Sequence, residues 1–156
     1  MKHLVVVDIL LILATAAALF VLIPFSITLV VNNKVESSRK EFRSFLNAIA
    51  KVESNCDDNA VGDNGKSLGR YQISRAYWYD ACERDPNLLF RHKWEDVTDP
   101  IYAEAIMESY WARYVTQAYL NKDYEILARV HNGGPRGYKK DSTILYWNKI
   151  KKELQL

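Results

Sequence analysis

The chain has 156 residues, of which 49% are hydrophobic and 26% are charged, with only 6 Gly and 4 Pro. This composition indicates one folded domain with a hydrophobic core and excludes a long disordered or low-complexity protein. The net charge of +2, without a run of basic residues interleaved with aromatic ones, does not indicate a protein that binds nucleic acid.

The N-terminal part, residues 1–33, is dominated by an apolar stretch. From Ile9 to Val31 there are 23 residues without a charge, and a helix of that length would span roughly 34 Å, enough to cross a bilayer. We therefore expect a transmembrane helix that anchors the protein in a membrane. A cleaved signal peptide is the alternative, because small residues cluster from Ala14 to Ala18, although the apolar region of such peptides normally has about 7–15 residues.

The orientation of this anchor is a point of conflict. Lys34, Arg39 and Lys40 follow the apolar stretch, and the positive-inside rule would keep the rest of the chain in the cytosol. The chemistry described below points instead to a domain outside the cytosol. We therefore expect a membrane-anchored protein with an extracellular or luminal domain, or a secreted protein if the N-terminus is cleaved.

The second part, residues 34–156, is expected to be a small, mainly α-helical domain of the α+β kind. Helical spacing of apolar residues and helix-ending residues predict helices over residues 37–54, 74–85, 101–122, 123–134 and 142–156. Ser37 or Ser38 would cap the first of these helices, and Ile101, Ala105 and Trp111 would share the apolar face of the third. Residues 61–72 are expected to form a short irregular or β element.

Two carboxylates stand out in the stretch VESNCDDNAVGDNGKSLGRYQI, residues 52–73. Glu53 ends an amphipathic helix beside Ile49 and Val52, so partial burial is expected to favour its protonated form. Asp63 lies in a polar turn, where it is expected to stay ionised. Glycoside hydrolysis uses such a pair, one carboxyl group as an acid and one as a nucleophile or a stabilising charge. Spacing alone does not separate this interpretation from two ordinary surface carboxylates.

Several motifs in one order resemble the invertebrate-type lysozymes, the destabilase family. They are ESNC, then D and GKSLGRYQISRAYWYDAC, then ESYWARY, and finally ARVHNGGPRGY and STILYWNKI. The resemblance covers about Ile49 to Ile150. It implies a lysozyme-like fold and cleavage of the β-1,4 bond between N-acetylmuramic acid and N-acetylglucosamine in peptidoglycan or a related amino-sugar glycan, in an antibacterial or digestive role.

Carried over to this sequence, the resemblance makes Glu53 the general acid and Asp63 the second carboxylate of a retaining mechanism, without a metal or other cofactor. The residues expected to contact the sugar are Tyr71, Gln72, Trp78, His131, Asn132 and Gly133. A non-catalytic module that grips glycan through Tyr71, Trp78 and the HNGGP turn is the alternative. Some family members also have isopeptidase activity, for which Ser67 and His131 would be the matching pair.

The chain departs from the family pattern chiefly in its cysteines. Family members usually carry ten or more, whereas this chain has two, Cys56 and Cys82. If they form a disulfide, they close a loop of about 25 residues, which in the chain-entropy model contributes roughly 3–4 kcal/mol of stability; two free thiols are the alternative. Asn55 also replaces the glycine of Glu-Ser-Gly-Cys, and Lys66 is inserted before Ser67.

Overall fold

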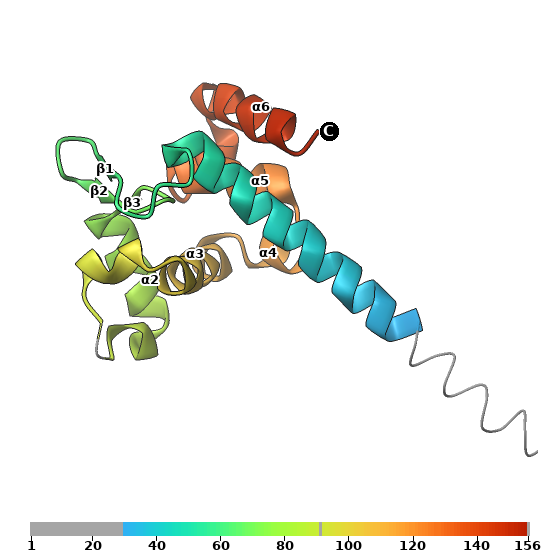
Figure 1. The fold of residues 1–156 in the computed structure, drawn as a ribbon, viewed down its shortest axis with the longest axis horizontal. Coiled ribbons are helices and arrows are strands. Elements are labelled where there is room, and N and C mark those ends of the chain that lie inside the picture. Colours follow the sequence, from blue (N-terminus) through green and yellow to red (C-terminus); the bar gives the residue numbers. More distant parts are fainter. Residues whose placement is uncertain (1–29, 91, 156) are drawn as a thin grey trace, which may run out of the picture. The chain divides into compact units, whose positions relative to one another are not determined.

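The computed structural model describes residues 30–90 and 92–155 (Figure 1). Residues Phe42–Leu156 form one compact unit, separate from Met1–Glu41. After a first helix over residues 30–54, the elements are β1 (Val61–Gly62), β2 (Ser67–Leu68), β3 (Ile73–Ser74), α2 (Arg75–Arg84), η1 (Pro86–Leu89), η2 (Trp94–Thr98), α3 (Pro100–Tyr114), α4 (Thr116–Asn121), α5 (Tyr124–Gly133), η3 (Gly137–Lys139), η4 (Asp141–Thr143) and α6 (Ile144–Glu153).

Local sequence explains where most helices begin. Ser74, Asp99 and Asp123 stand at the N-caps of α2, α3 and α5, and each side chain accepts a hydrogen bond from a backbone N–H of the first turn. Pro100 occupies the first turn of α3, where its missing N–H has no intrahelical partner to lose. The predicted helices over residues 74–85 and 123–134 are thereby confirmed to within a residue or two.

The end of the first helix positions Glu53. The N–H of Asn55 donates to the Lys51 carbonyl at 3.1 Å, and that of Cys56 donates to the Ala50 carbonyl at 3.0 Å. This closing pattern requires left-handed backbone, and Asn55 has φ 57°. Asparagine adopts this conformation more readily than most residues, which explains how it replaces the glycine of the family pattern. Glu53 therefore lies in the last turn of the helix.

The predicted β element is a small antiparallel sheet of order β1-β2-β3. Val61 pairs with Leu68, and Ser67 pairs with Ser74. The turn between β1 and β2 has left-handed backbone at Asp63, Asn64 and Gly65, with φ values of 51°, 56° and 85°. Asp, Asn and Gly are the residues that tolerate this conformation, so the sequence DNG determines a turn that carries Asp63 at its start.

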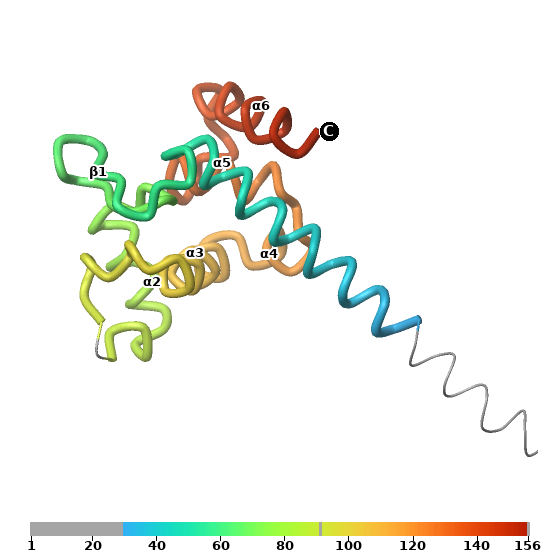
Figure 2. Tube along the Cα trace, in the orientation of Figure 1, coloured from blue at the N-terminus to red at the C-terminus, as the bar shows by residue number. Residues whose placement is uncertain are grey.

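The hydrophobic core brings together the first helix and α5 and α6, which follow later in the chain. Phe45, Leu46 and Ile49 are buried against residues such as Trp111, Leu127 and Ile150. Figures 1 and 2 show the chain leaving the sheet through α2 and α3 and returning with α5 and α6 beside the C-terminal part of the first helix. This return places residues of α5 and α6 around Glu53.

Three details of the predicted helices are wrong. The first helix already includes residue 30, because no helix-breaking residue lies between residues 30 and 37. Ser37 therefore lies inside the helix, where its hydroxyl donates to Glu41 at 3.4 Å instead of capping the helix. The predicted helix over residues 101–122 is broken at Val115, which has φ −142° and ψ 48°. Ile101 is 81% exposed, since Tyr102 and Ile106 face the core instead.

The two cysteines, whose pairing the sequence left open, do not form a disulfide in the structure. Cys56 and Cys82 are free, the first exposed and the second buried. Cys56 follows the left-handed turn at the end of the first helix, whereas Cys82 points from α2 into the core, with 1% of its surface exposed. Burial raises the pKa of the Cys82 thiol, as expected for a cysteine that acts as a small core residue.

Most of the predicted transmembrane stretch lies outside the described residues. Within residues 30–90 and 92–155, the structure contains no helix with the length and apolar character needed to cross a membrane.

Candidate active site

The Glu53 carboxyl group is shielded from water by side chains of two other helices. Its side chain is only 18% exposed, and Oε1 lies 3.7 Å from Nε2 of His131, whose side chain is 3% exposed. His131 comes from α5, and Tyr146 of α6 approaches Glu53 from a second element. The structure therefore confirms the partial burial that was expected for Glu53.

His131 is a neutral hydrogen-bonding residue of this site. Nε2 lies 3.0 Å from the Tyr71 carbonyl oxygen, and because a carbonyl only accepts, Nε2 carries the proton. Nδ1 is then free to accept from the Tyr77 hydroxyl at 3.4 Å. Burial lowers the pKa of His131, and this effect outweighs the opposing influence of Glu53 and the Tyr71 carbonyl. The ring is therefore fixed as the tautomer that donates from Nε2.

The Tyr146 hydroxyl is a feature of the site that the sequence did not single out. Tyr146 is 8% exposed, and within the described part of the chain its buried hydroxyl makes no hydrogen bond of ordinary geometry. Burial, followed by the neighbouring Glu53 carboxylate, raises the pKa of its phenol. Its position in STILYWNKI, inside the family resemblance, was the only signal that could have drawn attention to it.

Asp63 has the opposite surroundings. It lies exposed in the β1–β2 turn, and its Oδ2 accepts a hydrogen bond of 2.9 Å from the hydroxyl of Ser67. Ser67 is only 5% exposed and is paired with Ser74 in the sheet. A fixed donor thus holds a solvated carboxylate in one orientation.

The predicted sugar contacts in the sheet region have structural roles. Tyr71 is fully buried, and its hydroxyl donates to Glu104 at 2.8 Å, so its ring has no face open to a sugar. Gln72 has left-handed backbone with φ 49°, and its amide donates to the Gly69 carbonyl at 2.9 Å. Both residues support the loop that presents its backbone to His131.

The remaining predicted sugar-contact residues, Trp78, Asn132 and Gly133, have separate surroundings. Trp78 is half-buried, and its indole N–H donates to the Tyr102 hydroxyl at 2.7 Å. Asn132 is exposed directly after His131, and the Gly133 carbonyl accepts from Lys140 at 2.6 Å. Of the predicted sugar-contact residues, the structure therefore brings His131 to Glu53 and leaves Asn132 free to meet solvent.

Ser67 and His131 are engaged with different groups in this structure. The Ser67 hydroxyl donates to Asp63, while both ring nitrogens of His131 face Tyr71 and Tyr77. Serine catalysis needs a base within hydrogen-bonding distance of the hydroxyl, and no hydrogen bond joins this pair in the described part of the chain. Isopeptidase activity stays a prediction that this geometry does not favour.

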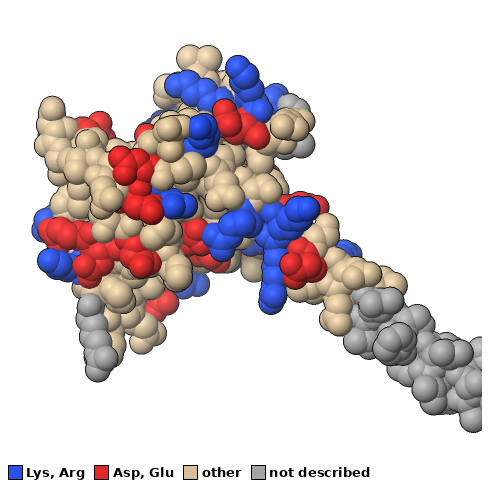
Figure 3. Space-filling view, viewed as in Figure 1, with Lys and Arg blue, Asp and Glu red and all other residues tan. Residues whose placement is uncertain are grey.

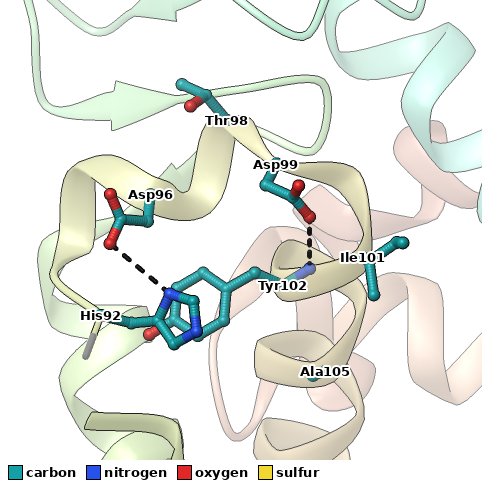
Figure 4. A pocket seen from close by; sticks show the side chains of 7 residues that line it. All are labelled: His92, Asp96, Thr98, Asp99, Ile101, Tyr102 and Ala105. Carbon is teal, nitrogen blue, oxygen red and sulfur yellow. Dashed lines mark hydrogen bonds and ion pairs between the residues drawn. The ribbon is translucent and has the colours of Figure 1, made fainter. Parts of the chain in front are cut away.

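A separate hollow of about 680 Å³ lies where η2 meets α3 (Figure 4). His92 stacks on Tyr102 there with ring centroids 4.2 Å apart, and its Nδ1 is 3.6 Å from Asp96. Figure 3 shows acidic side chains over this part of the chain and basic ones over α6. The lining includes none of the predicted site residues, and no cluster of His, Cys, Asp and Glu suited to a metal occurs among the described residues.

The arrangement of Glu53 and Asp63 fits acid-assisted cleavage of a glycosidic bond. One carboxyl group is largely removed from water beside a neutral histidine, and the other is exposed and held by a serine hydroxyl. Unequal environments of this kind separate the acid from the ionised partner in glycosidases.

Comparison with known proteins also relates this chain to lysozymes. The Destabilase family profile matches residues 43–153. The lysozyme of Meretrix lusoria is 40% identical over 112 residues, which cover 69% of this chain and 85% of that protein. Invertebrate-type lysozyme 6 of Caenorhabditis elegans is 37% identical over 113 residues, covering 68% and 82% of the two chains.

Solved structures show that the fold is shared. The crystal structure of Tapes japonica lysozyme has a TM-score of 0.58 at 29% identity, covering 70% of this chain and 87% of that one. The structure of Aeromonas hydrophila PliI in complex with Meretrix lusoria lysozyme gives 0.56 at 36% identity, with the same coverage. Because the family profile spans most of the chain, the protein belongs to the destabilase family of invertebrate-type lysozymes.

Proposed function

We propose that this protein is a muramidase that hydrolyses the β-1,4 bond between N-acetylmuramic acid and N-acetylglucosamine in bacterial peptidoglycan, in an antibacterial or digestive role. The observation that carries the proposal is the unequal burial of Glu53 and Asp63 in a chain whose relatives are lysozymes. The domain acts outside the cytosol, attached through its N-terminal apolar segment or secreted after cleavage.

Glu53 donates a proton to the glycosidic oxygen as the bond to the sugar breaks. Asp63 attacks or stabilises the resulting sugar cation from the opposite face, and Glu53 then accepts a proton from the water that completes hydrolysis. The hydrogen bond from Ser67 to Asp63 supports this retaining mechanism, because it holds the exposed carboxylate of Asp63 in one orientation. The family resemblance assigns Asp63, and no other residue, as the second carboxyl group.

Lysis of bacterial cell walls by the full-length protein tests this proposal. Wild-type protein should clear a suspension of cell walls, and Glu53→Gln should lower the rate by at least about a hundredfold, the usual contribution of a general acid. The matched control is Glu95→Gln, because Glu95 is an exposed glutamate paired with Arg75. Binding to insoluble peptidoglycan without cleavage by wild-type protein would show a glycan-binding module instead.

The stereochemistry of the first product tests the mechanism. A soluble peptidoglycan fragment is cleaved inside the NMR spectrometer, and initial formation of the β-anomer is expected for retention. Initial release of the α-anomer would show inversion and would remove Asp63 from the role of nucleophile.

A further inference from the structure

The ionised Glu53 carboxylate needs a hydrogen-bond donor that His131 does not fully supply. Its Oε1 lies 3.7 Å from His131 Nε2, beyond ordinary hydrogen-bonding distance. The proton on that nitrogen is directed instead at the Tyr71 carbonyl, 3.0 Å away. A further hydrogen-bond donor within reach would therefore stabilise the charge that proton transfer leaves on Glu53.

The Tyr146 hydroxyl has the complementary requirement. It is buried and makes no hydrogen bond of ordinary geometry within the described part of the chain, although the Glu53 carboxyl group is its neighbour; an unsatisfied buried hydroxyl is costly. Tyr146 and Ile150 are the buried residues of α6 and lie four positions apart, on one face of the helix. α6 packs on α5, and α5 carries His131, which lies beside Glu53. The buried face of α6 therefore holds the Tyr146 ring near Glu53.

We propose that Tyr146 is a positioning residue that donates a hydrogen bond to Glu53 when the carboxyl group becomes ionised after giving its proton to the leaving sugar. This inference rests on the proposed muramidase activity. A hydrogen bond to an ionised acceptor is roughly twice as strong as one between neutral groups, so the contact favours the state that follows proton transfer.

The proton balance leaves Tyr146 unchanged throughout the reaction. Glu53 loses its proton to the glycosidic oxygen, and it regains one from the attacking water. Tyr146 supplies only the hydrogen bond, because burial and the adjacent carboxylate raise the pKa of its phenol and keep it protonated. Among the described residues, the titratable groups facing Glu53 include His131 from α5 and Tyr146 from α6, with Tyr77 from α2 behind them.

Tyr146→Phe removes the donor and keeps the ring. We expect kcat to fall about tenfold with little change in KM, and the alkaline limb of the pH–activity profile to move up by about one pH unit, since a factor of ten corresponds to one unit. The matched control is Tyr119→Phe, which removes a phenol that donates to Glu108, in a tyrosine–glutamate pair that includes none of the active-site residues. Thermal unfolding of both variants separates an effect on catalysis from a loss of fold.

A direct readout is independent of activity. In full-length protein labelled with ¹³C at the tyrosine ζ-carbon, the signal assigned to Tyr146 by Tyr146→Phe should shift with pH in wild type, as Glu53 ionises. It should not shift in this way in Glu53→Gln.

The outcomes distinguish the two proposals. An unresponsive Tyr146 signal, or a folded Tyr146→Phe protein with the kcat and pH profile of wild type, would overturn the positioning role while lysis by wild type still supported the muramidase. A responsive signal in a wild-type protein that does not cleave peptidoglycan would refute the muramidase and reduce the contact to a structural one.

Discussion

Among single residues, Glu53 and Asp63 illustrate how the same functional group acquires different surroundings. Glu53 is enclosed by side chains from α5 and α6, and its side chain is only 18% exposed. Asp63 is exposed at the start of a left-handed turn and is held by one hydroxyl. The difference arises from helix packing on one side and local turn chemistry on the other.

Replacing Ser67 with alanine tests the importance of the hydrogen bond to Asp63. Ser67→Ala removes the 2.9 Å contact, so Asp63 should sample other orientations and kcat should fall about tenfold, or about 1.4 kcal/mol in barrier height. Ser142→Ala, at an exposed serine before α6, is the control. The test is a measurement of kcat and KM on peptidoglycan. An unchanged kcat would show that the catalytic role of Asp63 does not depend on its hydrogen bond with Ser67.

For whole elements, the turn after α5 depends on a close backbone approach. A β-carbon at Gly137 would lie 1.9 Å from the Arg129 carbonyl oxygen, so α5 and η3 pack together only with glycine at this position. Gly134, with φ 80°, supplies the left-handed residue that ends α5. The HNGGPRG sequence thus folds the chain back so that α6 can reach α5.

Gly137→Ala should therefore destabilise the protein by about 2 kcal/mol or more, because the backbone must shift to relieve the overlap. Gly65→Ala is a useful comparison, since Gly65 has φ 85° but open space around its β-carbon position. It should cost only about 1 kcal/mol from backbone strain. Chemical denaturation measures both values, and equal losses would mean that contact with Arg129 is unimportant.

For the molecule as a whole, burial of His131 links stability to pH. Its pKa is lowered in the folded state from a normal value of 6.5, so below about pH 6.5 the unfolded chain binds a proton that the folded chain does not. The free energy of unfolding should fall as pH drops, by up to about 1.4 kcal/mol per pH unit from this group. The loss continues until the lower folded-state pKa is reached.

Variants of two histidines isolate this contribution. His131→Gln should lose the part of the pH dependence just below pH 6.5, whereas His92→Gln, at a side chain that is 45% exposed, should retain it. Denaturant titrations between pH 4 and pH 8 give the free energies. A His131→Gln protein with the pH dependence of wild type would be inconsistent with a buried neutral histidine.

The whole domain is held together without a disulfide, so its stability should not depend on redox conditions. A thiol reagent should modify exposed Cys56 in the native protein and buried Cys82 only after unfolding. Cys56→Ser should abolish the fast reaction, and reductant should leave the denaturation midpoint unchanged. A midpoint that falls in reductant would reveal a cross-link.

Sequence by itself determined the mainly helical class, the positions of α2 and α5, and the small sheet around the DNG turn. These features depend on residues a few positions apart, whose hydrogen bonds and backbone preferences are local. Residue chemistry and the family resemblance both selected Glu53 and Asp63 as the candidate pair, and the unequal exposure of these two side chains agrees with this choice.

Only the tertiary structure decided which residues surround the acid. Glu53 lies in the first helix, far along the chain from His131 of α5 and Tyr146 of α6, and their approach depends on how α5 and α6 pack. Tyr71 is equally ambiguous in sequence, because an aromatic side chain can enter the core or face a sugar. Its full burial against Glu104 followed from the packing of α3. Periodicity and motif spacing contain no information about such contacts, since these depend on the free energy of the assembled core.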